Sequence, residues 1–211
     1  MSIPYLAYAA AFSILIPVIV GLLTIRSLQP DLKPLLILFV VNAIAVSLQY
    51  YLGSIDVNNL WIGHFYNLVE YNMLTLMISD WQEKEIAKTI FRISMLVFAV
   101  FWLVAKLYLE KLDQPSVYVI PVSRVLLACA SVYSLVGVAQ SKTLTFLENP
   151  RFWVLSALLV SSAGGLMFYA LRGMIAKLPS EQLLLAFSVH WSLIVVENLI
   201  YAGGFLCKVR R

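Results

Sequence analysis

The chain alternates between long apolar runs and short polar connections. Each apolar run holds about 20 residues, enough to cross the hydrocarbon core of a bilayer as a helix. Proline, glycine and charged residues gather in the connections, where they favour turns. The pattern therefore predicts an all-α integral membrane protein with seven transmembrane helices, at residues 4–25, 34–52, 60–79, 93–109, 118–140, 151–172 and 183–207.

Local features refine this prediction. Pro17 should kink the first helix, because proline lacks a backbone donor and crowds the preceding turn. The segment from Asp80 to Arg92 carries six charges in thirteen residues, which predicts a solvated connector before the fourth helix. Lys106 and Arg172 lie near helix ends, and we expect their charged groups to reach the membrane surface.

Composition excludes a soluble globular domain. Hydrophobic residues make up 62% of the chain, charged residues make up 12%, and the mean hydropathy is +0.89. The 211 residues leave room for seven helices and no soluble domain, so residues 1–211 are expected to form a single transmembrane domain. The net charge of +4 comes from scattered basic residues without a patch, which argues against a nucleic-acid partner. Cys129 and Cys207 are predicted at different depths, too far apart for a disulfide.

Basic residues are unevenly distributed between the two sides of the predicted bundle. Ten lie after helices one, three and five or at the C-terminus, and four lie on the other side. The positive-inside rule then predicts an external N-terminus and a cytoplasmic C-terminus. The N-terminal run lacks a basic signal-peptide region, so we interpret it as the first helix. We expect a multi-pass protein of the cytoplasmic (inner) membrane of a prokaryote.

Ionisable residues interrupt three of the predicted helices. Such groups are costly inside a membrane and usually face a bundle interior or a cavity. At about 1.5 Å per residue, the histidines and the arginine fall in the outer half of the membrane, and the glutamates lie just past its centre. These depths predict one ligand- or proton-binding site between helices three, five and seven, formed by His64, Asn67, Glu70, Tyr71, Arg124, His190, Glu197 and Tyr201.

The chemistry of this predicted site has two interpretations. Glu70 and Glu197 cannot cheaply both be ionised near the midplane, so we expect one proton shared by the pair, with the histidines as its route outward. Arg124 keeps its charge and needs an anion. Alternatively, the histidines could be neutral and hydrogen-bonded between helices, and the asparagines could serve only to join helices.

An internal repeat would account for part of this pattern. Helices three and seven both contain a histidine, then a glutamate and an asparagine, while helices one and five each contain a proline. A 3+1+3 plan would place two parallel three-helix units on either side of helix four. However, the histidine-to-glutamate spacing is six residues in one helix and seven in the other, and helices two and six do not match. Coincidence therefore remains open.

The sixth helix contains a stripe of small residues at a spacing of four, namely Ala157, Ser161 and Gly165. Small residues at this spacing allow two helices to approach closely. We expect the closest helix contact of the bundle here, and the same face is a candidate for a homo-oligomer or another membrane partner.

Three functions fit the predicted site. The first is a transporter of a small solute that is coupled to protons. Its partners would be the lipid bilayer and a small molecule or ion. The second is a membrane receptor or sensor, or a subunit of a larger membrane complex. The third is an intramembrane metal or haem protein with His64 and His190 as ligands. No residue is assigned a catalytic role.

Overall fold

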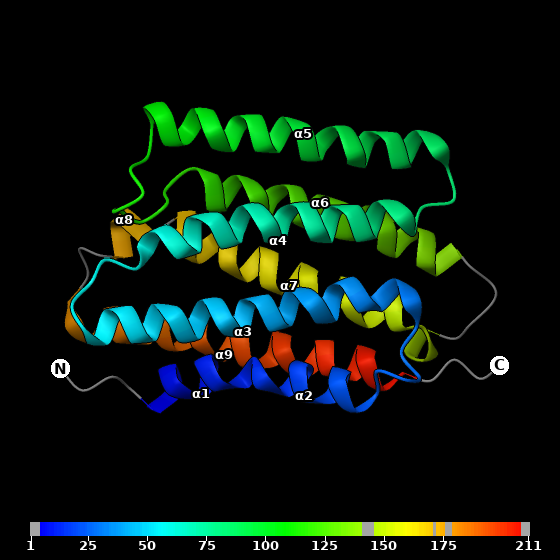
Figure 1. The fold of residues 1–211 in the computed structure, drawn as a ribbon, viewed down its shortest axis with the longest axis horizontal. Helices are drawn as coiled ribbons and strands as arrows, with labels where there is room; N and C mark the ends of the chain where they lie inside the picture. Colours follow the sequence, from blue (N-terminus) through cyan, green and yellow to red (C-terminus); the bar gives the residue numbers. More distant parts are fainter. Residues whose placement is uncertain (1–4, 141–145, 171, 176–178, 208–211) are drawn as a thin grey trace.

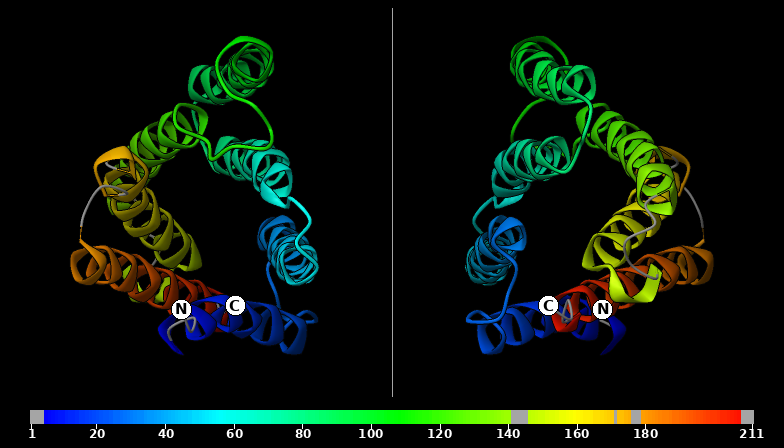
Figure 2. Two further views of the ribbon diagram at one scale, coloured as in Figure 1. Left: turned by 90° about the vertical axis from the view of Figure 1, so that its left-hand side faces the viewer. Right: turned by 90° about the vertical axis from the view of Figure 1, so that its right-hand side faces the viewer.

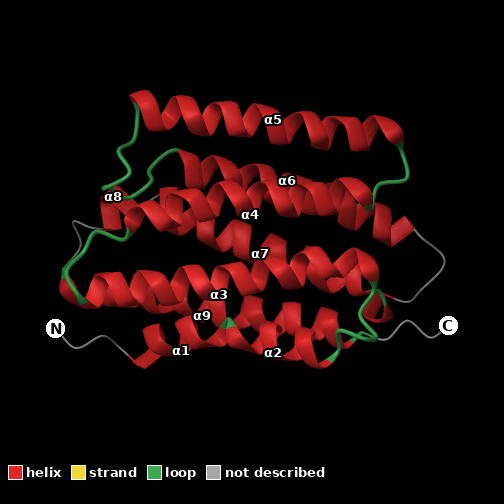
Figure 3. Cartoon of the chain, viewed as in Figure 1, coloured by secondary structure: helices red, strands yellow, loops and turns green. Residues whose placement is uncertain are grey.

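The protein is a bundle of long helices joined by short loops (Figure 3). The computed structural model describes residues 5–140, 146–170, 172–175 and 179–207, and these ranges contain no strand. Short 3-10 turns occupy Pro30–Leu32 and Phe146–Glu148. The α-helices are α1 (Tyr5–Ser13), α2 (Leu15–Leu23), α3 (Lys33–Ser54), α4 (Leu60–Asp80), α5 (Glu85–Tyr108), α6 (Val119–Gln140), α7 (Pro150–Ala170), α8 (Arg172–Ile175) and α9 (Ser180–Leu206).

The first predicted helix is divided into α1 and α2 at Ile14. Pro17 cannot donate a backbone hydrogen bond to the carbonyl of Ser13, four residues earlier, and its ring crowds that carbonyl. The interruption therefore falls where proline chemistry places it, and the predicted kink takes the form of a short break.

The prediction for the charged segment after Asp80 was wrong in part. Helix α5 begins at Glu85, so most of the segment is helical. Lys88 pairs with Glu85, three residues earlier on the same helix, at 2.6 Å. Arg92 pairs with Asp80, the last residue of α4, at 3.2 Å. These pairs are compatible with a helix that extends past its apolar portion, which hydropathy alone does not reveal.

The long helices other than α5 surround a common interior, together with α1 and α2, and α5 lies outside them (Figure 2). Going around the bundle, α1 and α2 are followed by α3, α4, α6, α7 and α9, and each segment packs against the next. Helix α9 closes the circuit against α1 and α2. Helix α5 packs mainly on α4, and the two termini lie at opposite ends of the bundle (Figure 1).

Six segments are long and apolar enough to cross a membrane, which indicates a multi-pass membrane protein. Among the described helices of similar length, α4 falls short of this criterion because its polar face lowers its hydropathy. Ten of its 21 residues are buried, and it packs against α3, α5 and α6. Neighbouring helices thus cover the polar side chains of α4, the least apolar of the long described helices.

The small-residue stripe of α7 faces the inside of the monomer. Ala157 is fully buried, Ser161 lines an internal cavity, and Gly165 lies against the stem of Arg124. This face is therefore not available to a partner. A Cβ atom at Gly165 would meet other atoms at an ordinary 3.7 Å, whereas one at Gly164 would approach a side-chain atom of Leu193 to 2.5 Å. That the stripe makes the closest helix contact of the bundle stays a prediction.

Helix α9 approaches α7 closely at Gly204. A Cβ atom there would lie 3.2 Å from Cβ of Trp153, 3.4 Å from Val154 and 3.5 Å from the Pro150 carbonyl oxygen. Gly204→Leu should therefore force the helices apart and destabilise the protein by about 1–3 kcal/mol, seen as a lower Tm in detergent. Gly137→Leu is the control, because a Cβ atom at Gly137 meets nothing within 4 Å. Equal Tm values for the two variants would contradict this account of the α7–α9 contact.

Candidate functional site

A cavity of about 380 Å³ lies between α1, α3, α4, α6, α7 and α9. The apolar part of its wall comes mainly from α1 and α3, including Ala7, Ala10 and Leu38. The polar part of its wall comprises Asn42, Gln49, Tyr50, Tyr66, Asn67, Glu70, Arg124, Ser161, Tyr169, His190, Glu197, Asn198 and Tyr201. Six of the eight residues predicted for the site therefore line one cavity.

Arg124 on α6 forms an ion pair with Glu70 on α4. Its Nη2 donates to Oε2 of Glu70 at 2.9 Å, and only 14% and 12% of the two side chains are exposed. The remaining guanidinium nitrogens, Nε and Nη1, are buried and have no hydrogen-bond partner among the described residues. Buried donors without partners are costly, so these two nitrogens leave an unmet hydrogen-bonding requirement on a residue that lines the cavity.

Glu197 on α9 supplies a second carboxylate. It accepts a hydrogen bond from Ser161 on α7 and interacts electrostatically with Arg124 and Glu70. Its side chain keeps some exposed surface because it borders the cavity. The described wall thus holds two carboxylates and one permanently charged cation, so one carboxylate lacks a permanent counter-charge.

Two asparagines join neighbouring helices across the cavity wall. Asn67 on α4 donates to Oγ of Ser123 on α6 at 2.9 Å, and Asn198 on α9 donates to Oγ of Ser13 on α1 at 2.8 Å. Both therefore act as the interhelical links considered from sequence. However, Oδ1 of Asn67 is buried with no partner among the described residues, so the cavity also offers a free acceptor.

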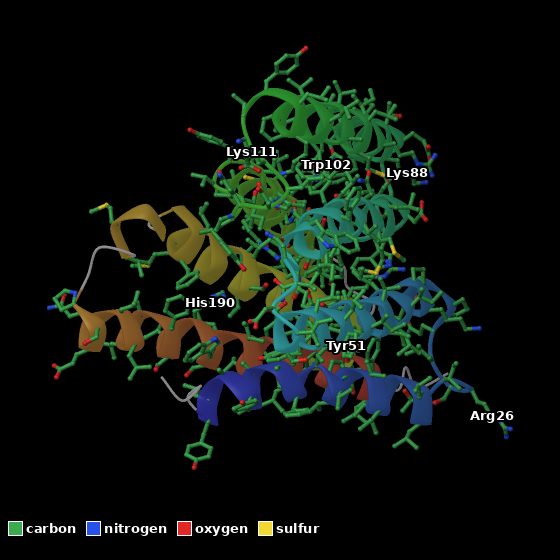
Figure 4. All side chains as sticks on the ribbon, turned by 60° about the vertical axis from the view of Figure 1, so that its left-hand side comes forward. Arg26, Tyr51, Lys88, Trp102, Lys111 and His190 are labelled. Atoms are coloured by element: carbon green, nitrogen blue, oxygen red, sulfur yellow. The ribbon has the colours of Figure 1, made fainter. Side chains whose placement is uncertain are left out.

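Aromatic rings surround the remaining predicted residues of the cavity. The ring of His190 on α9 stacks on the ring of Phe168 on α7, with 4.1 Å between the ring centroids and 4° between the planes. Figure 4 shows His190 between these two helices. The ring of Tyr201 meets Phe39 of α3 edge-on at 4.9 Å. Both residues are therefore held in place by neighbouring helices.

Two predicted residues lie away from the cavity, because the rotation of α4 directs them toward α5. The hydroxyl of Tyr71 donates to Oγ of Ser94 on α5 at 3.2 Å, and its ring packs on Phe98 at 4.0 Å. His64 lies against the end of α5 and the loop that follows it. The structure therefore does not bring His64 and His190 together.

His64 belongs to a second polar cluster that contains Lys106. Nζ of Lys106 lies 2.7 Å from Nδ1 of His64, and Nε2 lies 2.8 Å from the carbonyl oxygen of Gln114. A charged lysine can only donate, so Nδ1 accepts and the protonated Nε2 donates to Gln114. With both ring nitrogens occupied, His64 is not available to a haem or metal ion. Within the described ranges, no three His, Cys, Asp or Glu side chains form a metal-binding group.

Glu110 completes this cluster and was missed from sequence. It forms an ion pair with Lys106, so that the expectation of a surface-reaching Lys106 was wrong: the two side chains are only 3% and 6% exposed. The side chain of Arg172 lies outside the described residues. The Glu110 carboxylate also accepts from Ser116 at 2.9 Å and from the backbone N–H groups of the residues that lead into α6, namely Val117, Tyr118 and Val119.

Glu110 therefore caps the N-terminus of α6, where unpaired N–H groups favour a negative charge. Burial raises the pKa of its carboxyl, but hydrogen bonds from Lys106, Tyr118 and Ser116 lower it more, so that the pKa falls from 4.5 to about 2. The sequence signal for this cap was the Lys106–Glu110 spacing of four residues at the end of an apolar helix.

Loss of the Glu110 charge should destabilise the protein. Glu110→Gln would leave Lys106 buried without a counter-charge and should cost about 3–5 kcal/mol. Because the folded-state pKa is lowered, Glu110 stabilises the parent fully above about pH 4.5, and this stabilisation is lost as the pH falls toward about 2. Tm measured against pH should therefore fall in that window for the parent, and this component should be absent from the variant.

The exposed Glu85, which also pairs with a lysine, provides the matched control. Glu85→Gln should change Tm little, because an exposed ion pair contributes about 0–1 kcal/mol. If the two glutamine variants melt alike, Glu110 does not have the proposed capping role.

Comparison of the chain with protein-family models, with curated proteins and with solved structures finds no match. Function is therefore inferred from the chemistry of the cavity itself.

Proposed function

We propose that the protein is a small membrane transporter that binds a small polar solute in the central cavity. The observation that carries this proposal is the set of buried, unpartnered atoms on two residues that line the cavity: two Arg124 donors and the Asn67 acceptor. A wall built only for stability would satisfy such groups within the protein, because each costs free energy when left alone. A solute that offers both an acceptor and a donor would satisfy them.

We further propose that transport is coupled to protons. Because Arg124 pairs with Glu70, Glu197 is the cavity carboxylate without a permanent counter-charge, and we propose that it carries the coupled proton. Glu70 is instead engaged in its ion pair with Arg124 at 2.9 Å. A solute that changes the charge of the cavity would shift the proton, which links binding to proton movement.

The helix arrangement supports a 3+1+3 organisation. One unit comprises α1 with α2, then α3 and α4, while the other comprises α6, α7 and α9. The units meet at α4 with α6 and at α9 with α1, and each meeting carries an asparagine-to-serine hydrogen bond. Two units around a central site are the plan expected of transporters that alternate access.

For orientation, we propose an external N-terminus and a cytoplasmic C-terminus in the cytoplasmic membrane of a prokaryote. Lys88 and Arg26 lie toward one end of the bundle and Lys111 toward the other (Figure 4). Among the described residues, the end at which α2, α4, α6 and α9 finish also holds most of the basic residues of the connections. A C-terminal fluorescent protein that folds only in the cytoplasm should be bright in cells, and a C-terminal fusion active only in the periplasm would contradict this orientation.

Glu197→Gln tests proton coupling. The amide keeps the shape of the carboxylic acid and fixes the neutral form, so the variant should fold and lose the pH dependence of binding. The measurement is binding and uptake in proteoliposomes with and without a pH gradient. Tyr71→Phe is the control, because Tyr71 lies outside the cavity. Unchanged pH dependence in Glu197→Gln would remove Glu197 from the mechanism, and pH-dependent binding without uptake would favour a receptor.

A further inference from the structure

We infer that the solute is a protonated organic amine with a neighbouring carbonyl or hydroxyl oxygen, and that it binds in exchange for a proton on Glu197. This inference rests on the proposed transport function and adds the substrate class. In the exchange, the Glu197 carboxylic acid releases its proton to water and becomes a carboxylate. The ammonium group stays protonated and forms an ion pair with that carboxylate, so charge is conserved inside the cavity.

The charge inventory of the cavity supports a cation. Glu70 and Arg124 neutralise each other, and Glu197 is the remaining acidic group. The α1 part of the described lining is apolar and adds no charge. The other ionisable groups of the lining are Tyr50 from α3, Tyr66 from α4, Tyr169 from α7, and His190 and Tyr201 from α9.

Even with Glu197 protonated, an anionic solute would bring a second negative charge beside Glu70 against the single guanidinium. A zwitterion would leave the cavity balanced only while Glu197 kept its proton, so its binding would release none. A monocation instead balances the ionised Glu197 one for one, and this balance favours the amine.

The hydrogen-bonding groups fit the same class. Oδ1 of Asn67 can accept an N–H of the ammonium group, while Nε and Nη1 of Arg124 can donate to a carbonyl or hydroxyl oxygen. Tyrosines and Trp191 line the wall, and their ring faces attract organic cations. The apolar surface of α1 and α3 can hold the hydrocarbon part of the amine.

Four phenylalanine derivatives test this inference, because they share a side chain and differ in charge. At about pH 6, well below the ordinary α-amino pKa of about 7.7–8.0, phenylalaninamide is a cation with a carbonyl oxygen, phenylalanine is a zwitterion, N-acetylphenylalaninamide is neutral, and N-acetylphenylalanine is an anion. Calorimetry in two buffers of different ionisation enthalpy measures binding and proton release together. Phenylalaninamide should bind most tightly and should release a proton. Tighter binding of phenylalanine or of the anion would overturn the substrate class, and this comparison needs no variant.

Variants test the assignment of the proton. Glu197→Gln should abolish proton release and weaken phenylalaninamide binding roughly thirtyfold or more, the effect of removing one partner of a buried charge pair. Its affinity for neutral N-acetylphenylalaninamide should change little, and Tyr71→Phe should behave like the parent. Proton release that persists in Glu197→Gln but disappears in His190→Gln would overturn the role of Glu197.

Uptake of the same compounds into proteoliposomes separates the two proposals. Phenylalaninamide that binds with proton release but is not transported would support the substrate class and contradict the transporter. Proton-dependent uptake of another solute, without binding of any of the four derivatives, would support the transporter and contradict the amine class.

Discussion

The cost of a charge in a low-dielectric interior is the constraint on which this bundle depends. Arg124 cannot release its proton, so it must be accompanied by an anion wherever the fold buries it. Glu70 provides that anion from a neighbouring helix. The pair fixes the face that α4 turns toward α6, and this orientation brings Asn67 to Ser123 and turns Tyr71 toward α5.

Two buried polar clusters share this constraint but differ in how completely they satisfy it. Around Glu110, the carboxylate receives Lys106, a serine hydroxyl and backbone N–H groups, and both nitrogens of His64 are occupied. Such a saturated network stabilises one conformation and has no capacity left for a ligand. Around Arg124, by contrast, donors and an acceptor remain unpaired beside a cavity. This difference assigns a structural role to the first cluster and favours a binding role for the second.

Hydropathy was sufficient to predict the helices, because each long helix has to match the thickness of a membrane or pack against others that do. Proline chemistry predicted a kink at Pro17, because the missing backbone donor is a matter of covalent geometry alone. Hydropathy did not predict the start of α5 at Glu85, because a helix stabilised by ion pairs can continue into water without an apolar signal. The division of the polar residues between the cavity and α5 was also unpredictable, since it depends on the rotation of α4 about its axis. Residues one turn apart, such as His64 and Asn67, therefore reach different surroundings.

The polar links between the two proposed three-helix units, apart from the Glu70–Arg124 pair, are individually weak. Inside the bundle, the boundary is crossed by the hydrogen bonds of Asn67 and Asn198, and such interhelical bonds contribute about 0.6 kcal/mol each on average. Toward the end that holds the C-terminus, Arg151 reaches Asp31 across the same boundary at 3.0 Å, and both side chains are partly exposed, which limits that pair to about 1 kcal/mol. The stronger constraint is the Glu70–Arg124 pair at the cavity. A rocking motion of the proposed transporter would therefore be expected to pivot near this pair while the weaker links break and form on either side of it.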